Sequence, residues 1–125
     1  MHRRRIERLN EQIKRELMDL LRRELSDPRV ANVTLTAVES TPDLYHARIY
    51  VTTLGGAEER ESALAGLLAA RSLLRGQLGR RLHIRRVPEL EFVWDEVLEQ
   101  ARRIESLLAQ VRPPEAPPAD EPADG

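Results

Sequence analysis

The spacing of apolar residues changes several times along this chain, and the order of the changes restricts the fold more than any other feature. In residues 4–25, apolar side chains recur every three or four positions, which predicts an amphipathic helix ending at Asp27-Pro28. Residues 33–38 and 47–53 alternate and are rich in β-branched side chains, so we expect two strands. The turn sequence at residues 40–43 favours an antiparallel hairpin between them.

A second helical pattern follows Gly55-Gly56 and continues to Leu82. An unbroken helix of about 25 residues would span roughly 37 Å, which is long for so small a domain. We therefore expect a bend near residues 70–72, or around Gly76, so that both halves can pack on one sheet.

The alternating pattern returns once more near the end of the chain. Leu90, Phe92 and Trp94 share one side of a third predicted strand, and their residue types favour the core. A last helix is expected from Glu96 to Val111, with Asp95 as its N-cap.

Helices gathered on one face of such a three-stranded sheet predict an α+β fold. We expect a single domain over residues 1–95, a C-terminal helix over residues 96–112, and a disordered, acidic, proline-rich tail over residues 113–125. The 125 residues, 41% hydrophobic and 33% charged, suffice for one modest core.

The composition also excludes several classes of protein. The chain has no cysteine, which excludes a disulfide scaffold and a thiolate metal site and fits a reducing cytoplasm. Its apolar runs are far shorter than the roughly 20 residues of a membrane span. A secretory signal requires an apolar segment after its N-terminal basic residues, and none follows the arginines here.

The formal net charge of −1 conceals a strong segregation of charge along the chain. Residues 71–86 carry six arginines and no acid, and residues 1–30 carry nine basic and six acidic groups. The last thirteen residues, by contrast, carry four acids and no base. Such segregation indicates a polyanionic partner, and guanidinium groups suit phosphate recognition.

The candidate RNA contacts are the arginines of these two basic segments. The excess of arginine over lysine is better explained by a genome rich in G and C, which favours arginine codons. The clustering of the arginines in two segments is not explained in this way and favours a functional role. The candidates are Arg71, Arg75, Arg80, Arg81, Arg85 and Arg86, joined by Arg4 and Arg8.

Nothing in the sequence has the spacing of a catalytic or metal site. His2, His46 and His83 lie in different predicted elements, and Glu89 and Glu91 share a strand face without a basic or nucleophilic partner. We expect no enzyme activity, no metal and no cofactor. Aromatic residues make up only 3% of the chain, so RNA recognition would depend on backbone charge and shape rather than on base stacking.

With these elements in order, the sequence resembles the ribosome-binding factor A family. The resemblance covers roughly residues 4–110 and consists of short pieces, each weak alone, in the order and spacing of the family. The pieces are Asp27-Pro28-Arg29, Val38, Thr41, Asp43-Leu44, Ala47 to Val51, Leu74-Arg75, Leu78, Arg85, Pro88-Glu89-Leu90, Phe92 and Asp95.

The resemblance implies a KH-like domain of bacterial type II topology, with the order α-β-β-α-kink-α-β. It also implies a cytoplasmic, non-enzymatic assembly factor that binds the small (30S) ribosomal subunit and assists maturation of the 5′ region of 16S rRNA, with a role in the cold. Late-acting assembly GTPases are implied as partners, and we expect a monomer.

In this family a helical kink written Ala-x-Gly replaces the usual loop of KH domains. Here the corresponding residues are Ala70, Arg71 and Ser72. Serine keeps a Cβ atom that glycine lacks, but its hydroxyl can bond back to the preceding turn and bend a helix, so we expect the kink to be retained.

A second hypothesis is a protein-interaction or dimerisation module with the same fold. The first and last predicted helices each have an apolar face that a partner or a second copy could cover. A stable dimer with no RNA affinity, detected by light scattering, would favour this alternative.

Overall fold

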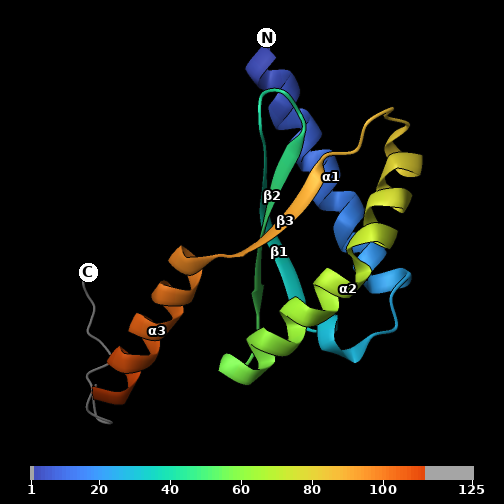
Figure 1. Ribbon diagram of the computed structural model, residues 1–125. Coiled ribbons are helices and arrows are strands. Elements are labelled where there is room, and N and C mark those ends of the chain that lie inside the picture. Colours follow the sequence, from blue (N-terminus) through green and yellow to red (C-terminus); the bar gives the residue numbers. More distant parts are fainter. Residues whose placement is uncertain (1, 112–125) are drawn as a thin grey trace. The chain divides into compact units, whose positions relative to one another are not determined.

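The computed structural model describes the backbone of residues 2–111, and the side chains of this range except those of residues 2, 3, 99, 102, 103, 106 and 111. The predicted tail, residues 113–125, and the last residue of the predicted C-terminal helix lie outside this range. The elements are α1 (His2–Arg23), the 3₁₀ turn η1 (Pro28–Val30), β1 (Val33–Ser40), β2 (His46–Thr53), α2 (Ala57–Leu82), β3 (Glu89–Trp94) and α3 (Glu96–Val111) (Figure 1). One compact unit ends at Asp95, and a second begins with α3.

The three strands form one mixed sheet in the order β1-β2-β3. β1 pairs antiparallel with β2, which confirms the predicted hairpin, and β2 pairs parallel with β3. Parallel neighbours need a long crossover, and α2 supplies it. The fold is therefore α+β, as the order of apolar patterns predicted.

A bulge in β1 departs from the regular alternation that was predicted. Leu35 pairs with Val51 and Ala37 with Tyr50, so Thr36 between them is the extra residue. Because of this insertion, Leu35 and Val38 both face the core although they are three positions apart. The Thr36 hydroxyl donates to Asp95 Oδ2 at 2.6 Å.

The sheet has one apolar and one polar face. Buried side chains of the first include Val33, Leu35, Val38, Ala47, Ile49, Val51 and Leu90, and they pack with those of α1 and α2. Phe92 and Trp94 were expected in the core but are only partly buried at its margin. The opposite face carries polar side chains such as Arg48, Tyr50 and Glu91.

α1 packs against the sheet through the predicted apolar stripe, which includes the buried Ile13, Leu17 and Leu20. The helix ends at Arg23, before the predicted stop at Asp27-Pro28. Asp27 instead caps η1, where its carboxylate accepts the Arg29 N–H at 2.9 Å. Pro28 occupies the first turn of η1, where no backbone donor is required.

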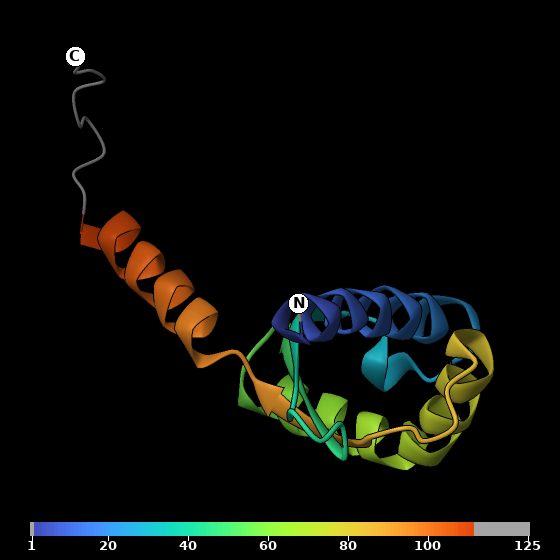
Figure 2. The ribbon, with the colours of Figure 1, turned by 90° about the horizontal axis from the view of Figure 1, so that it is seen from above.

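α2 is one uninterrupted helix whose axis changes direction near its middle, between the green and yellow parts of the ribbon (Figures 1 and 2). A stripe including Ala63, Leu67, Leu74 and Leu78 stays buried on both sides of the bend. Among the described residues, the Ser72 hydroxyl makes no hydrogen bond, so this bend does not depend on serine bonding to the preceding turn.

The described part of the chain has neither a membrane-spanning helix nor a cluster of metal ligands. No described helix is both long enough and apolar enough to cross a membrane. No group of three or more histidine, cysteine or acidic side chains is placed to hold a metal ion within residues whose side chains are described.

Candidate nucleic-acid interface

The arginines of residues 71–86 fall into two groups in the structure. Arg75 and Arg81 are half-buried and have partners within the protein. The others, Arg71, Arg80, Arg85 and Arg86, are exposed. Helical spacing separates neighbours in the sequence, because consecutive residues on a helix point in different directions.

Arg75 connects α2 to the segment that leads into β3. Its Nε donates to the Pro88 carbonyl at 3.0 Å and its Nη2 to the Val87 carbonyl at 2.6 Å. Its Nη1 lies 3.7 Å from Glu89 Oε2. These two hydrogen bonds give partners to the carbonyl groups of the last two residues before β3, of which Pro88 is buried.

Arg81 joins the second half of α2 to α1, which lies beside it (Figures 1 and 2). Its Nη1 donates to Asp19 Oδ2 at 2.7 Å and to Glu16 Oε1 at 3.0 Å. The hydrogen bond to Asp19 lowers the pKa of the Asp19 carboxyl and raises the pKa of Arg81. Arg81 therefore neutralises the acidic side of α1 rather than adding to an open basic surface.

A groove of about 520 Å³ lies between the second half of α2 and the segment before β3. Three arginines take part in its lining, one on α2 and two on the opposite side. The lining residues are Ser72, Arg75, Gly76, Arg85, Arg86 and Val87. No acidic side chain among the described residues lines this groove, and it has more arginines in its lining than any of the three other pockets described below or at η1.

The turn between β1 and β2 lies beside arginines from both basic segments, residues 1–30 and residues 71–86. The Arg86 guanidinium lies over the ring of Tyr45, 4.2 Å from its centroid. On the α1 side, Arg5 and Arg8 line an apolar pocket of about 310 Å³ with Pro42 and Leu44 of this turn. Arg8 and Arg86 therefore flank one hairpin turn, although they are 78 positions apart in the chain.

The turn itself has a defined conformation. Leu44 has a φ of 63°, in the left-handed region that residues other than glycine rarely adopt. The Asp43 carboxylate accepts from the Thr41 hydroxyl at 2.6 Å and from the Tyr45 N–H at 3.0 Å. These bonds, the Thr41 bond first, lower the pKa of Asp43. The position of Tyr45 beneath Arg86 is thus supported by its own turn.

The predicted residues Arg4 and Arg8 are exposed on α1, and no hydrogen bond or ion pair holds either one among the described residues. In the predicted kink, Ala70 is half-buried against the core, and Arg71 and Ser72 are exposed. Ser72 reaches the groove, and Arg71 precedes it in the helix.

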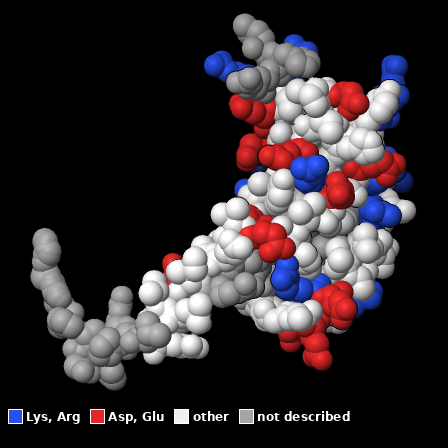
Figure 3. Space-filling model, turned by 60° about the vertical axis from the view of Figure 1, so that its left-hand side comes forward, with Lys and Arg blue, Asp and Glu red and all other residues white. Residues whose placement is uncertain are grey.

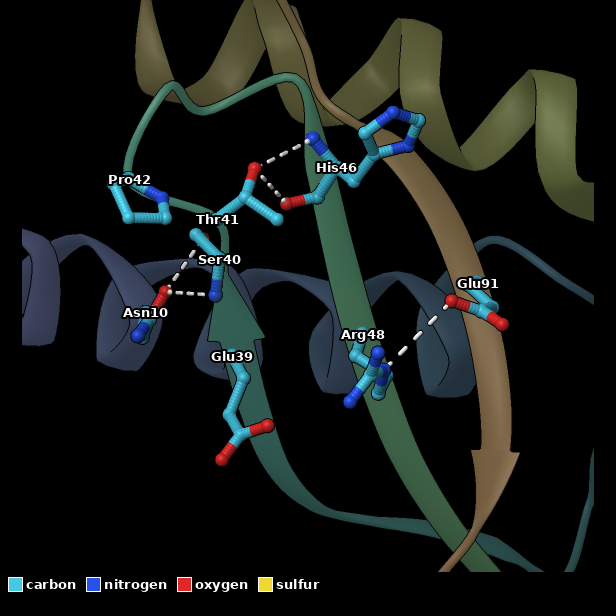
Figure 4. Close-up of a pocket in the computed structure, with 8 residues that line it drawn as sticks. All are labelled: Asn10, Glu39, Ser40, Thr41, Pro42, His46, Arg48 and Glu91. Carbon is cyan, nitrogen blue, oxygen red and sulfur yellow. Dashed lines mark hydrogen bonds and ion pairs between the residues drawn. The ribbon is translucent and has the colours of Figure 1, made fainter.

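A polar pocket on another part of the surface has mixed charge. Figure 4 shows Glu39, Arg48 and Glu91 along the outer face of the sheet, with Arg48 Nε 3.8 Å from Glu91 Oε1. Across the same pocket, Asn10 Oδ1 accepts from the backbone N–H of Ser40 at 3.1 Å. Figure 3 likewise shows acidic and basic side chains interspersed on the face that it presents. A polyanion would meet carboxylates at this pocket, whereas the groove beside Gly76 presents none.

The comparison with known families identifies the chain. The sequence profile of the ribosome-binding factor A family matches residues 5–108. This chain belongs to the ribosome-binding factor A family. The resemblance first drawn from short sequence pieces is thereby confirmed.

Individual members of the ribosome-binding factor A family are similar in sequence and in structure. Ribosome-binding factor A of Brevibacillus brevis is 42% identical over 111 residues, which are 89% of this chain and 92% of the relative. The crystal structure of ribosome-binding factor A from Thermus thermophilus gives a TM-score of 0.63 at 34% identity, covering 70% of this chain and 91% of that one. A Thermus thermophilus homology model fitted into a cryo-electron-microscopy map of a 30S complex gives 0.59 at 34% identity, with the same coverage of 70% and 91%.

Several residues that carried the resemblance to the ribosome-binding factor A family have structural roles here. Leu74, Leu78 and Leu90 are buried in the core. Asp27 caps η1 and pairs with Arg29, whose side-chain hydrogen bond lowers the pKa of the aspartate. These pieces of the family pattern therefore maintain the fold and do not by themselves indicate a binding surface.

Reasoning from the sequence missed three residues at the candidate interface of this ribosome-binding factor A family member. They are Tyr45, Val87 and, as a groove residue, Gly76. The available signal was the place of Tyr45 directly after the predicted turn at residues 40–43, where a tyrosine need not be buried. Gly76 was noted only as a place where the helix could bend.

Proposed function

We propose that this protein is a non-enzymatic ribosome assembly factor that binds the small ribosomal subunit through 16S rRNA. The observation that carries the proposal is the groove between α2 and the segment before β3, which arginines line from both walls and no described acidic side chain lines. Membership of the ribosome-binding factor A family and the similarity to a relative fitted into a 30S complex support it.

Direct contact with the RNA backbone is assigned to the exposed arginines Arg71, Arg80, Arg85 and Arg86 of the second basic segment, and to Arg4 and Arg8 of α1. Arg75 and Arg81 are assigned a different task, because their guanidinium groups already bond within the protein. Arg75 holds the groove together, and Arg81 holds α1 and α2 together.

More specific proposals about topology, location and rRNA maturation follow from membership of the ribosome-binding factor A family. The order of helices and strands, with β2 and β3 parallel, is consistent with a KH-like domain of type II topology in which the bend of α2 replaces the usual loop. We place the protein in the cytoplasm as a monomer that acts late in maturation of the 5′ region of 16S rRNA. A role in the cold and release by assembly GTPases are part of the proposal.

Co-sedimentation of the purified protein with purified small subunits, at low and high salt, tests the proposal. We expect saturable binding near one protein per subunit. Neutralisation of about four phosphates would give a slope of log affinity against log salt concentration on the order of −3 to −4.

A matched pair of double variants tests the groove. Arg85→Gln with Arg86→Gln should weaken binding by about tenfold or more, because it removes two charges that pair with phosphates. Arg15→Gln with Arg22→Gln removes the same charge from exposed positions on α1 outside the groove and should have a much smaller effect. Equal losses of affinity in the two variants would contradict a localised interface, and a slope near zero would contradict electrostatic binding.

A further inference from the structure

α2 contains three glycines, and two of them have an evident packing role. A Cβ atom on Gly66 would lie 2.8 Å from Val30 Cγ1, and a Cβ on Gly79 would lie 2.8 Å from Val87 Cγ2. Real Cβ atoms do not approach other atoms so closely, so these two positions allow α2 to pack against η1 and against the segment before β3.

Gly76 has no such role. A Cβ atom placed there would meet nothing within 4 Å apart from its chain neighbours and the backbone of its own helix, and the residue is exposed in the interior of a helix. Glycine at such a position costs about 1 kcal/mol relative to alanine, because its backbone loses more freedom on folding. Packing within the described part of the fold does not account for this cost.

Gly76 does have a distinctive place on the surface. It lies on the wall of the basic groove, one helical turn after Ser72, so the exposed hydroxyl and the bare backbone are on the same face of α2. The absence of a side chain at this point leaves the helix backbone accessible to a ligand in the groove.

The arginines around Gly76 are held in different ways. Arg75 bonds through Nε and Nη2 to the carbonyls of the opposite wall, which keeps its guanidinium beside the groove. Arg86 is held over Tyr45 at 4.2 Å from the ring centroid. Arg85 is exposed and makes no hydrogen bond or ion pair with a described residue, so its guanidinium can turn toward a bound anion.

We propose that Gly76 is the point of closest approach of a single-stranded phosphodiester backbone, which lies in the groove between Ser72 and Gly76 on one wall and Arg85 and Arg86 on the other. The inference rests on the proposed RNA-binding function and assigns it a position. The ligand is recognised by its phosphates, since guanidinium groups and a hydroxyl suit phosphate oxygens and the groove has no stack of aromatic rings to read bases.

The test is a neutral side chain that blocks the groove without disturbing the helix. Gly76→Gln adds a long uncharged group in open space and replaces glycine by a better helix former, so the melting temperature should not fall. Ala65→Gln places the same side chain at an exposed site of α2 outside the groove and serves as the control.

Binding of both variants is measured with purified small subunits and with a short fluorescein-labelled single-stranded RNA over a range of salt concentrations. Gly76→Gln should weaken binding by about tenfold or more. Its salt slope should become shallower by about 0.7 for each phosphate of the single-stranded RNA that the glutamine displaces from the arginines, although no charge on the protein has changed. Ala65→Gln should bind like the original protein.

The outcomes separate this inference from the proposed function. If Gly76→Gln binds with unchanged affinity and slope while Arg85→Gln with Arg86→Gln is impaired, the RNA does not approach Gly76, and the assembly-factor proposal stands. If the unaltered protein fails to bind small subunits at low salt, both proposals are wrong. A loss of affinity without a change in salt slope would show that the glutamine displaced no phosphate, and would also overturn the inference.

Discussion

Arg80 and Arg81 are neighbours in α2, yet they have different surroundings. Arg80 is exposed, whereas the side chain of Arg81 is 26% exposed and lies between Asp19 and Glu16 of α1. Both residues occupy the last turn of the helix, where positive charge is favoured by the helix dipole. Only the tertiary neighbours give Arg81 a role in joining two helices.

Replacing Arg81 by alanine should raise the pKa of Asp19, because the hydrogen bond that holds that carboxylate in its charged form is removed. Arg80→Ala should leave the Asp19 pKa unchanged. NMR titration of the side-chain carboxyl carbons measures both values. An identical Asp19 pKa in the two variants would show that Arg81 does not stabilise this carboxylate.

The ion pair between Arg81 and Asp19 makes the stability of the folded protein depend on pH. Because the pKa of Asp19 is lowered in the folded state, its contribution to stability is present above about pH 4, the ordinary range of an unfolded aspartate, and is lost as the pH falls through the lower folded value. Arg81→Ala should therefore reduce the loss of stability with falling pH in this acidic range. Urea denaturation at several pH values between neutral and strongly acidic measures this difference.

At the scale of the element, α2 has a buried side and an exposed side on each half of the helix. Leu74 is 1% exposed and belongs to the core, whereas its neighbour Leu73 is 47% exposed. The buried stripe continues through the bend, so the two halves of α2 contact the same core in two directions (Figure 2). A straight helix of this length could not follow the core in this way.

Leu74→Ala should lower the free energy of unfolding by about 2–5 kcal/mol, since it removes a buried side chain and leaves a cavity near the bend. Leu73→Ala removes the same atoms from a half-exposed position and should cost less than about 1 kcal/mol. Urea denaturation of the two variants provides the comparison. Equal losses of stability would mean that this part of α2 is rotated relative to the described structure.

At the scale of the whole molecule, the residues that form the core all lie in the first unit. The buried apolar cluster runs from Ile13 to Leu90, and no residue of α3 whose side chain is described belongs to it. α3 instead carries exposed apolar side chains at Val97, Ile104, Leu107 and Leu108. The candidate RNA interface also lies within residues 4–87.

A chain that ends at Asp95 should therefore fold cooperatively and retain its affinity for the small subunit. Circular dichroism during thermal unfolding and co-sedimentation test the two parts of this prediction. Loss of binding by a folded shortened chain would assign the α3 segment, or the residues after it, a part in the interaction. That result would favour the protein-interaction hypothesis for that segment.

The sequence by itself determined the order of helices and strands. Apolar spacing depends only on local geometry, so it predicted the start of α3 at Glu96 and the bounds of the other elements within a few residues. The bulge at Thr36 was missed because it becomes visible only when β1 is aligned with β2. The three-residue step between Leu35 and Val38 was the available signal.

Only the tertiary structure decided which arginines of the basic segment are available to a ligand. All six carry the same charge, and helical spacing alone could not show that α1 supplies acids to Arg81 or that carbonyl groups before β3 occupy Arg75. Those partners lie 12 to 65 residues away in the chain. Electrostatic and hydrogen-bonding neighbours depend on distance in space, so a binding surface is determined by packing, whereas helices and strands are largely determined by local sequence.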